Sequence, residues 1–199
     1  MPRPARFTHD DILDAALAGV VRHGPRVNVA DIADELQGPV GSIYHRFPSR
    51  DALMVRLWLR SVERFQAGLA PLAALPDAHE ALLAMARHIP QFCRTHPDEA
   101  TCLTLFRQDR LLGEGPDELR DVVATMNDTV TALLAGVTRR RYGRVTKRHH
   151  HCVRMATVVA PYGLVRPYLG GPIPLLVDDA TAAAADAILN LGDHPPRSG

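Results

Sequence analysis

Apolar residues return at the helical period along almost the whole chain. In the stretch from Leu119 to Val137 they occupy positions 119, 122, 123, 126, 130, 133, 134 and 137, a spacing that places them on one side of a helix. No segment alternates apolar and polar positions between hairpin-type turns, as a half-buried β-strand would. The pattern therefore predicts an all-α protein of about nine helices.

Residues 28–51, NVADIADELQGPVGSIYHRFPSRD, predict two short helices and the start of a third. Asn28 suits the N-cap of the first helix, and Asp31 places a carboxylate near the unpaired amides of its first turn. Gly38 and Pro39 should end that helix, because glycine supplies unusual backbone angles and proline suits the first position of a new helix. Ser49 suits the cap of the third.

The second short helix is expected over residues 39–47. Ile43 and Phe47 are four apart and should pack inward. The other positions should form an exposed edge that is small, polar and aromatic: Val40, Gly41, Ser42, Tyr44 and His45. Such side chains suit a helix that lies in the major groove of DNA. The segment is therefore interpreted as a helix-turn-helix.

Three motifs at fixed spacing carry a family resemblance: IA at 32–33, GSIYHRF at 41–47 and SRDAL at 49–53. Together they resemble the signature of the tetracycline-repressor-like (TetR) family of bacterial transcriptional regulators. Gly38 departs from the family pattern, which usually has a β-branched or apolar residue there. Pro39 and Val40 also stand around a usual Ser or Thr cap.

The resemblance implies roles for the exposed edge. Tyr44 is expected to hydrogen-bond a DNA phosphate, with packing against the first helix as the alternative. Val40, Ser42 and His45 match family positions that reach base edges or adjacent phosphates, and Gly41 allows close backbone approach.

Three further residues complete the predicted DNA-binding set. Arg50 stands where the family usually has Lys, at a helix start where a cation gains nothing from the helix dipole. A phosphate contact would explain it, and a solvated surface arginine is the alternative. Asn28 and Arg46 flank the two short helices and are included in the set.

Charge does not by itself indicate a nucleic-acid partner. The chain has 23 Lys plus Arg against 22 Asp plus Glu, and residues 1–50 hold six arginines and six acids. Any affinity for DNA must therefore come from the placement of individual groups. Arg3 and Arg6 in a proline-rich N-terminal arm are such groups, as are Arg46 and Arg50 beside the second short helix.

Three segments are predicted along the chain: a helix-turn-helix domain at 1–49, a helical ligand-binding and dimerisation domain at 50–193, and a disordered tail at 194–199. The first helix should run from a capping box at Thr8 and Asp11 to His23. Proline and glycine residues further along the chain predict a break at 71–76, a kink or end at Pro90, a loop at 111–116 and a kink at Pro161. Helical periodicity predicts one long helix over 117–141 and a last helix over 175–191.

The resemblance implies that the second domain encloses a pocket for a small effector and forms a homodimer through the last two helices. Large or polarizable residues that could line an apolar cavity are Trp58, His88, Phe92, Cys102, Phe106, Met126, Met155 and Tyr162. Ordinary core packing is the alternative for each of them. No cofactor is predicted.

Two other features favour ordinary explanations. The consecutive His149, His150 and His151 point about 100° apart on a helix and cannot converge on one metal ion. The basic run 139–151 is expected to be a solvated loop, with nucleic-acid binding as the alternative. Cys93, Cys102 and Cys152 form no CxxC pair and are expected to be free buried thiols, although a redox pair of Cys93 with Cys102 stays open.

The N-terminus lacks the apolar run of a signal peptide and no apolar run reaches the length of a membrane span, so a cytoplasmic location is expected. The predicted function is a ligand-responsive transcriptional regulator that acts as a homodimeric repressor on a pseudo-palindromic double-stranded DNA operator. One alternative is a helical sensor or interaction protein without DNA binding. The other is a small helical enzyme, although the sequence has no HExxH, GxSxG or paired ExxH motif.

Overall fold

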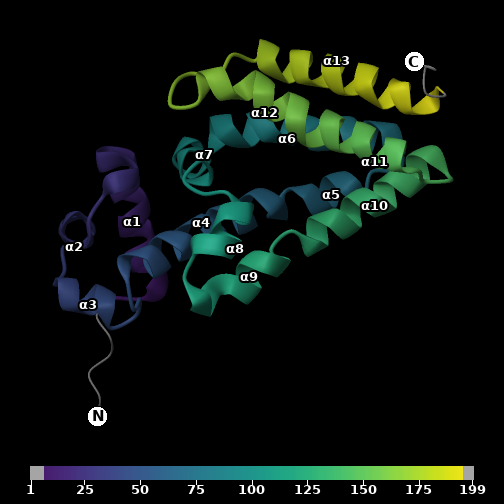
Figure 1. The fold of residues 1–199 in the computed structure, drawn as a ribbon. Coiled ribbons are helices and arrows are strands. Elements are labelled where there is room, and N and C mark those ends of the chain that lie inside the picture. Colours follow the sequence, from purple (N-terminus) through teal and green to yellow (C-terminus); the bar gives the residue numbers. More distant parts are fainter. Residues whose placement is uncertain (1–6, 195–199) are drawn as a thin grey trace. The chain divides into compact units, whose positions relative to one another are not determined.

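The computed structural model describes residues 7–194, and all of its regular elements over that range are helices (Figure 1). The prediction of an all-α protein is therefore confirmed. Arg3 and Arg6 of the N-terminal arm lie outside the described residues, as does the predicted tail apart from His194.

The chain divides into two compact units. The first comprises Met1–Glu63 and Asp98–Met126, and the second comprises Arg64–Pro97 and Asn127–Gly199. Residues 98–126 thus belong with the N-terminal segment in unit 1. Helix α4 contributes residues to both units.

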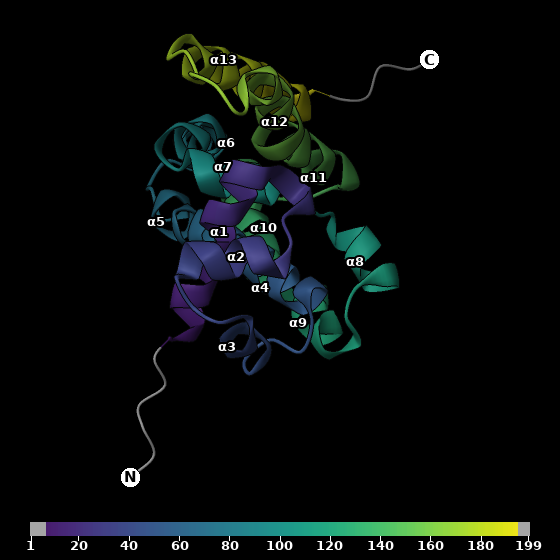
Figure 2. The ribbon, with the colours of Figure 1, turned by 90° about the vertical axis from the view of Figure 1, so that its left-hand side faces the viewer.

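Unit 1 contains the predicted helix-turn-helix, which faces the viewer in Figure 2. Its helices are α1 (His9–His23), α2 (Val29–Leu36), α3 (Val40–Tyr44), most of α4 (Arg50–Ala67), α7 (Pro97–Leu103), α8 (Gln108–Glu114) and α9 (Arg120–Thr125), with 3-10 turns at Gly24–Arg26 and Asp117–Leu119. The first three begin and end close to the predicted residues. Helix α3 is shorter than expected, because it starts after Pro39 and ends at Tyr44.

The core of unit 1 joins the first four helices. Ile12 of α1, Ile32 of α2, Ile43 of α3 and Leu53 of α4 are all fully buried in one apolar cluster. Burial of each such side chain stabilises the fold by about 1.5–3 kcal/mol. Because each helix contributes a residue to this cluster, the helix-turn-helix is held as one rigid body.

Local capping explains where these helices begin. The Thr8 hydroxyl accepts from the Asp11 amide and the Asp11 carboxylate accepts from the Thr8 amide, which is a complete capping box. Asn28 and Asp31 form the same reciprocal pair at the start of α2. Ser49 accepts from the amide of Ala52 at the start of α4. All three capping positions were predictable from sequence and are confirmed.

Unit 2 consists of α5 (Leu69–Ala73), α6 (Ala78–Thr95), α10 (Asp128–Tyr142), α11 (Lys147–Arg154), α12 (Ala160–Val165) and α13 (Leu176–Asn190). A π-helical segment, Met155–Val159, joins α11 to α12. Its core includes the fully buried Leu82, Ala86, Ala156, Ala185 and Leu189. Small side chains let α13 pack closely on α6.

Three predicted boundaries are wrong. Residues 71–73 of the expected break at 71–76 belong to α5, and α8 occupies most of the expected loop at 111–116 because Leu111 is buried in the core of unit 1. Helix α6 does not end at Pro90, since packing of its buried face outweighs the one backbone bond that proline removes, and the kink expected there stays a prediction. The expected helix over 117–141 breaks at Met126 and Asn127, because α9 buries Val123 in unit 1 and α10 buries Val137 in unit 2.

The predicted disturbance at Pro161 takes the form of the π-helical segment. Proline has no N–H, so α-helical hydrogen bonding cannot continue undisturbed into it. The wider turns of Met155–Val159 lie immediately before α12, with the amide of Ala160 bonded to the carbonyl oxygen of Met155.

Candidate DNA-binding surface and ligand pocket

Helix α3 presents one buried and one exposed face. Ile43 is 1% exposed and Phe47, just beyond the helix, is 4% exposed, so both pack inward as predicted. On the opposite face Val40 is 38% and Tyr44 is 50% exposed. Large apolar or aromatic side chains held in water by a rigid short helix are available to a partner.

Gly41 and His45 extend this exposed face, and Ser42 is half-buried beside it. A Cβ added at Gly41 would meet nothing within 4 Å, so another surface can approach the backbone there. The set Val40, Gly41, Tyr44 and His45 is called the reading face below.

The turn between α2 and α3 differs from its prediction. Gln37, not Gly38, adopts the left-handed conformation, with φ 51° and ψ 42°. A Cβ at Gly38 would lie 2.6 Å from Cε2 of Phe7. Gly38 therefore leaves room for the Phe7 ring, and its departure from the family pattern has a packing reason. Sequence reasoning missed Phe7, since its contact joins positions 31 apart.

Arg50 is bound to the protein's own backbone. Its Nε donates to the carbonyl oxygen of Val27 at 2.6 Å and its Nη2 donates to that of Pro25 at 2.8 Å. Its Nη1 also lies 3.4 Å from a carboxylate oxygen of Asp51. These bonds fix the start of α4 to the turn before α2. The phosphate contact expected of Arg50 stays a prediction, while its structural role accounts for its position.

Asn28 is likewise committed in part to local structure. Its Oδ1 accepts from the amides of Ala30 and Asp31 at 2.8 and 2.9 Å. Arg46 is half-buried and lines a cavity of about 320 Å³ together with His9 and Phe47. The His9 ring meets the Phe47 ring edge to face at 5.3 Å. A DNA contact by Asn28 or Arg46 remains a prediction.

Ion pairs hold α1 against its neighbours in unit 1. Arg60 of α4 lies 2.8 Å from Asp14 of α1, and Arg22 of α1 lies 3.0 Å from Glu35 of α2. The backbone hydrogen bond from Thr8 lowers the pKa of Asp11 below its ordinary value, so the carboxylate that closes the first capping box stays ionised at neutral pH. These contacts orient the scaffold behind the reading face.

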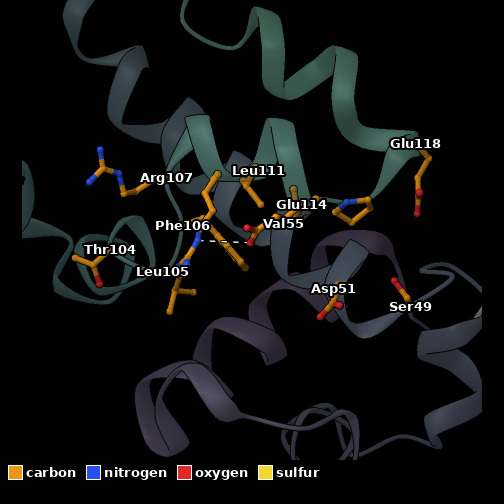
Figure 3. Close-up of a pocket in the computed structure, with 13 residues that line it drawn as sticks. Ser49, Asp51, Val55, Thr104, Leu105, Phe106, Arg107, Leu111, Glu114 and Glu118 are labelled. Atoms are coloured by element: carbon orange, nitrogen blue, oxygen red, sulfur yellow. Dashed lines mark ion pairs between the residues drawn. The ribbon is translucent and has the colours of Figure 1, made fainter.

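Unit 1 also contains a cavity of about 730 Å³, lined by residues of α4, α8 and the segments at 104–107 and 115–118 (Figure 3). Phe106 is the one predicted ligand residue that lines it. Trp58, Cys102 and Met126 belong instead to the apolar cluster of unit 1. Sequence reasoning missed the remaining lining residues, because several are charged and were not expected around an apolar effector.

The other four predicted ligand residues lie in unit 2. His88 and Phe92 pack with Phe65 in an aromatic group, and a ring nitrogen of His88 lies 2.8 Å from the carbonyl oxygen of Phe65. Met155 and Tyr162 are exposed. The structure therefore does not gather the eight residues around the cavity of unit 1.

The basic run 139–151 is not a loop, which corrects that expectation. It consists of the end of α10 and the start of α11, with residues 143–146 between them. Arg140 donates to the carbonyl oxygens of Ala73 and Leu75, and Arg141 pairs with Asp193 at 2.6 Å. His149 stacks on Tyr142, with ring centroids 4.3 Å apart.

The cysteines are unpaired; Cys102 and Cys152 are buried as expected, whereas Cys93 is only half-buried. Burial raises the pKa of both Cys93 and Cys102 to about 11. Protonated thiols are poor nucleophiles. Within residues 7–194, no group of three or more His, Cys, Asp or Glu side chains could hold a metal ion. None of the described helices has both the length and the apolar character needed to cross a membrane.

The helix-turn-helix segment is similar to a family of known proteins. Residues 12–57 match the family described as bacterial regulatory proteins, tetR family. No curated protein sequence matches the chain. Solved structures share its fold over most of its length. A transcriptional regulator from Rhodococcus sp. RHA1 is 17% identical with a TM-score of 0.74, and the alignment covers 96% of this chain and 100% of that one.

Two more of the similar structures are transcriptional regulators, one of them solved with a bound ligand. The regulator FadR from Bacillus subtilis, solved in complex with stearoyl-CoA, is 16% identical with a TM-score of 0.61 and covers 93% of this chain and 97% of its own. The ketosteroid transcriptional regulator KstR2 of Mycobacterium tuberculosis is 19% identical with a TM-score of 0.64 and covers 93% and 94%.

A short helix with a buried anchor and an exposed reading face, preceded by a capped helix and a tight turn, defines the class of helix-turn-helix DNA-binding proteins. Residues 12–57 match the bacterial regulatory proteins of the tetR family, and solved transcriptional regulators share the fold along the rest of the chain.

Proposed function

We propose that this protein is a ligand-responsive transcriptional repressor that binds a pseudo-palindromic operator as a homodimer. The observation that carries the proposal is the reading face, where Val40, Tyr44 and His45 stand in solvent on a helix anchored by Ile43. An anchored helix of this kind can enter a major groove without rearrangement. The Tyr44 hydroxyl would bind a phosphate, while Val40 and His45 would meet base edges.

A homodimer would supply two such helices to one operator. An exposed apolar strip on the π-helical segment and α12, formed by Met155, Val158, Val159 and Tyr162, supports this part of the proposal. A monomer gains nothing from keeping these side chains in water, whereas a two-fold interface would bury them. Ala183 and Ala187 are exposed on α13, where their small size would permit close helix packing.

The response to a ligand would be a shift between two states of the dimer. An effector releases DNA only when it binds better to the state that fits the operator poorly. FadR, which was solved with stearoyl-CoA, and the ketosteroid regulator KstR2 show that the shared fold serves regulators of different ligands. The effector of this chain must therefore be argued from its own cavity.

A mobility-shift experiment tests the proposal. Duplex DNA from upstream of the protein's own coding sequence, and duplexes selected from a random pool, are titrated with the purified protein at two salt concentrations. A specific, salt-sensitive complex is expected, and Tyr44→Ala should weaken it while Tyr168→Ala, another exposed tyrosine, should not. Failure of both DNA sources to give a specific complex would exclude the proposed function.

The dimer is tested separately by light scattering. The unmodified chain should have twice the mass of one protomer, and Val159→Glu should reduce it towards one by placing a charge in the proposed interface. A monomeric unmodified protein at micromolar concentration would contradict the homodimer. A control at Val21, which is also exposed but on α1, should leave the mass unchanged on substitution by Glu.

A further inference from the structure

The cavity of unit 1 lies against the first turns of α4. Ser49 and Asp51 line it at the start of that helix and Val55 lines it one turn later. The opposite wall comes from Leu111 and Glu114 of α8 and from Glu118 in the following turn. Its volume of about 730 Å³ falls within the range of small-molecule sites, roughly 300–1,000 Å³. A ligand in it would touch the helix that directly follows the reading face.

The interior of the cavity offers an apolar surface that includes an aromatic ring. Val55 and Leu111 are buried and Phe106 is half-buried, and Figure 3 shows Phe106 and Val55 in the middle of the lining residues. The Phe106 ring is held edge to face against Trp58, with centroids 6.2 Å apart. A fixed, partly open ring can accept both an apolar body and a cation over its face.

The charges around this surface are unequal. Three carboxylates line the cavity, those of Asp51, Glu114 and Glu118, against the guanidiniums of Arg107 and Arg110. Arg110 is paired with Glu114 at 3.6 Å, and Arg107 is paired with Asp109, which does not line the cavity. Asp51 is paired with Arg50, which also does not line the cavity. The lining thus holds three carboxylates against two guanidiniums. Its surplus charge is negative.

Resting on the proposed function for its regulatory meaning, we propose that this cavity binds an amphipathic organic cation, with an ammonium group on an apolar body. The body would pack on Val55, Phe106 and Leu111. The ammonium would lie by Asp51 and Glu118, within reach of the Phe106 ring face. A carboxylate or phosphate ligand would meet those two acids with like charge.

Asp51 gives the site a route to the DNA-binding helices. Its carboxylate lies 3.4 Å from Nη1 of Arg50, and the same guanidinium holds the carbonyl oxygens of Val27 and Pro25 before α2. A bound ammonium competes with Arg50 for the Asp51 carboxylate. The bond network at the start of α4 then differs between the occupied and empty states, which gives the ligand a differential effect on the reading face.

The chain contains a reporter for this site. Trp58 is its single tryptophan and touches the Phe106 ring that lines the cavity. Its fluorescence is followed during titration of the full chain, without DNA, by three probes that share one apolar body: 4-phenylbutylamine, 4-phenylbutan-1-ol and 4-phenylbutyrate. Calorimetry provides a second measure of binding that does not depend on tryptophan.

The amine is expected to bind roughly tenfold more tightly than the alcohol and more tightly still than the acid. Glu118→Gln and Asp51→Asn should each weaken amine binding roughly twofold to fivefold and leave binding of the alcohol unchanged. Glu63→Gln, which removes an exposed acid of α4 that does not line the cavity, should change neither. Equal affinity for the three probes would overturn the proposal. So would an affinity for the amine that stays unchanged in both Glu118→Gln and Asp51→Asn.

The experiment separates this site from the proposed function. Charge-selective amine binding by a protein that forms no specific DNA complex would uphold the site and exclude the regulator. A specific DNA complex with no amine preference would uphold the regulator and exclude the site. Where both hold, addition of the amine to the mobility-shift assay should dissociate the complex, and less so for Asp51→Asn.

Discussion

The guanidinium of Arg50 and the carbonyl oxygen of Val27 are joined by a hydrogen bond of 2.6 Å. A second bond from the same side chain to Pro25 makes the contact two-pronged. The planar guanidinium of arginine presents its donors in a fixed fork that suits both carbonyl oxygens, whereas the ammonium of lysine is a compact point charge. The start of α4, which follows the helix-turn-helix in sequence, is thereby fixed to the turn that precedes α2.

Removal of the Arg50 guanidinium should affect the stability of the fold more directly than the affinity for DNA. Arg50→Ala is expected to lower the free energy of unfolding by about 1–2 kcal/mol, because two hydrogen bonds from a charged donor are lost. Urea denaturation measures the change. Arg154→Ala, at an exposed position of α11, should change the free energy by less than about 0.5 kcal/mol. Equal effects of the two substitutions would show that the contacts of Arg50 contribute nothing.

Tyr44 should act through its hydroxyl and not through its ring. Tyr44→Phe is expected to weaken operator binding roughly tenfold, as loss of a hydrogen bond to a charged phosphate would, and to leave the unfolding free energy unchanged. The dissociation constant is measured by fluorescence anisotropy at fixed salt. Tyr168→Phe is the matched control. An unaltered constant for Tyr44→Phe would rule out the phosphate bond.

The left-handed conformation of Gln37 predicts a stabilising substitution. With φ at 51° its side chain is strained, whereas glycine adopts that conformation freely. Gln37→Gly should raise the free energy of unfolding by about 0.5–1 kcal/mol. Gln91→Gly, in the interior of α6, should lower it by a similar amount. If both substitutions destabilise, the conformation of Gln37 is not strained.

The capping box at Thr8 should make stability depend on pH. The backbone hydrogen bond from Thr8 lowers the pKa of Asp11 below 3.8 in the folded chain. A lowered folded pKa contributes stability above the unfolded value and loses it as the pH falls through the folded value. Asp11→Asn should therefore destabilise the protein at about pH 6, and its difference from the unmodified chain should shrink towards about pH 3. Asp34→Asn, on the exposed side of α2, should show no such convergence.

The thiols of Cys93 and Cys102 should be unreactive in the folded protein. Burial raises the pKa of Cys93 and Cys102 to about 11, so the thiolate is scarce at neutral pH. Iodoacetamide at about pH 7.5 should modify both slowly in the native chain and quickly in urea, as read by peptide mass spectrometry. A raised folded pKa also means that their contribution to stability is complete below the unfolded value and is lost as the pH rises towards 11. Rapid alkylation of both thiols in the native chain would instead support the hypothesis that Cys93 and Cys102 form a redox pair.

Local signals predicted the DNA-binding helices well because those helices are specified locally. Thr8, Asn28 and Ser49 are caps whose partners lie within three residues, and the packing of Ile43 follows from helical spacing. The boundaries that failed depend on distant partners. Helix α8 forms because Leu111 enters the core of unit 1, and the break at Met126 follows from burial in two different cores.

The candidate site divides in the same way. Exposure of Tyr44 and Val40 followed from the helical period, whereas the bonds of Arg50 join positions 23 and 25 apart in sequence. The cavity was missed since its walls come from separate segments and its charged residues resemble an ordinary solvated surface. The size of Phe106 predicts that it could line a cavity, whereas its place in one cavity with Asp51 and Glu118 depends on the fold.

The π-helical segment determines which side of the continuous helical rod from α11 through α12 is buried. Buried or half-buried positions recur there every four residues, at 152, 153, 156, 157, 160, 161, 164 and 165. A pure α-helix advances about 100° per residue and would drift by roughly 40° in each such repeat. The wider turns of Met155–Val159 take up part of that drift. The exposed strip consequently runs nearly straight, and a second rod could lie along it without winding around it.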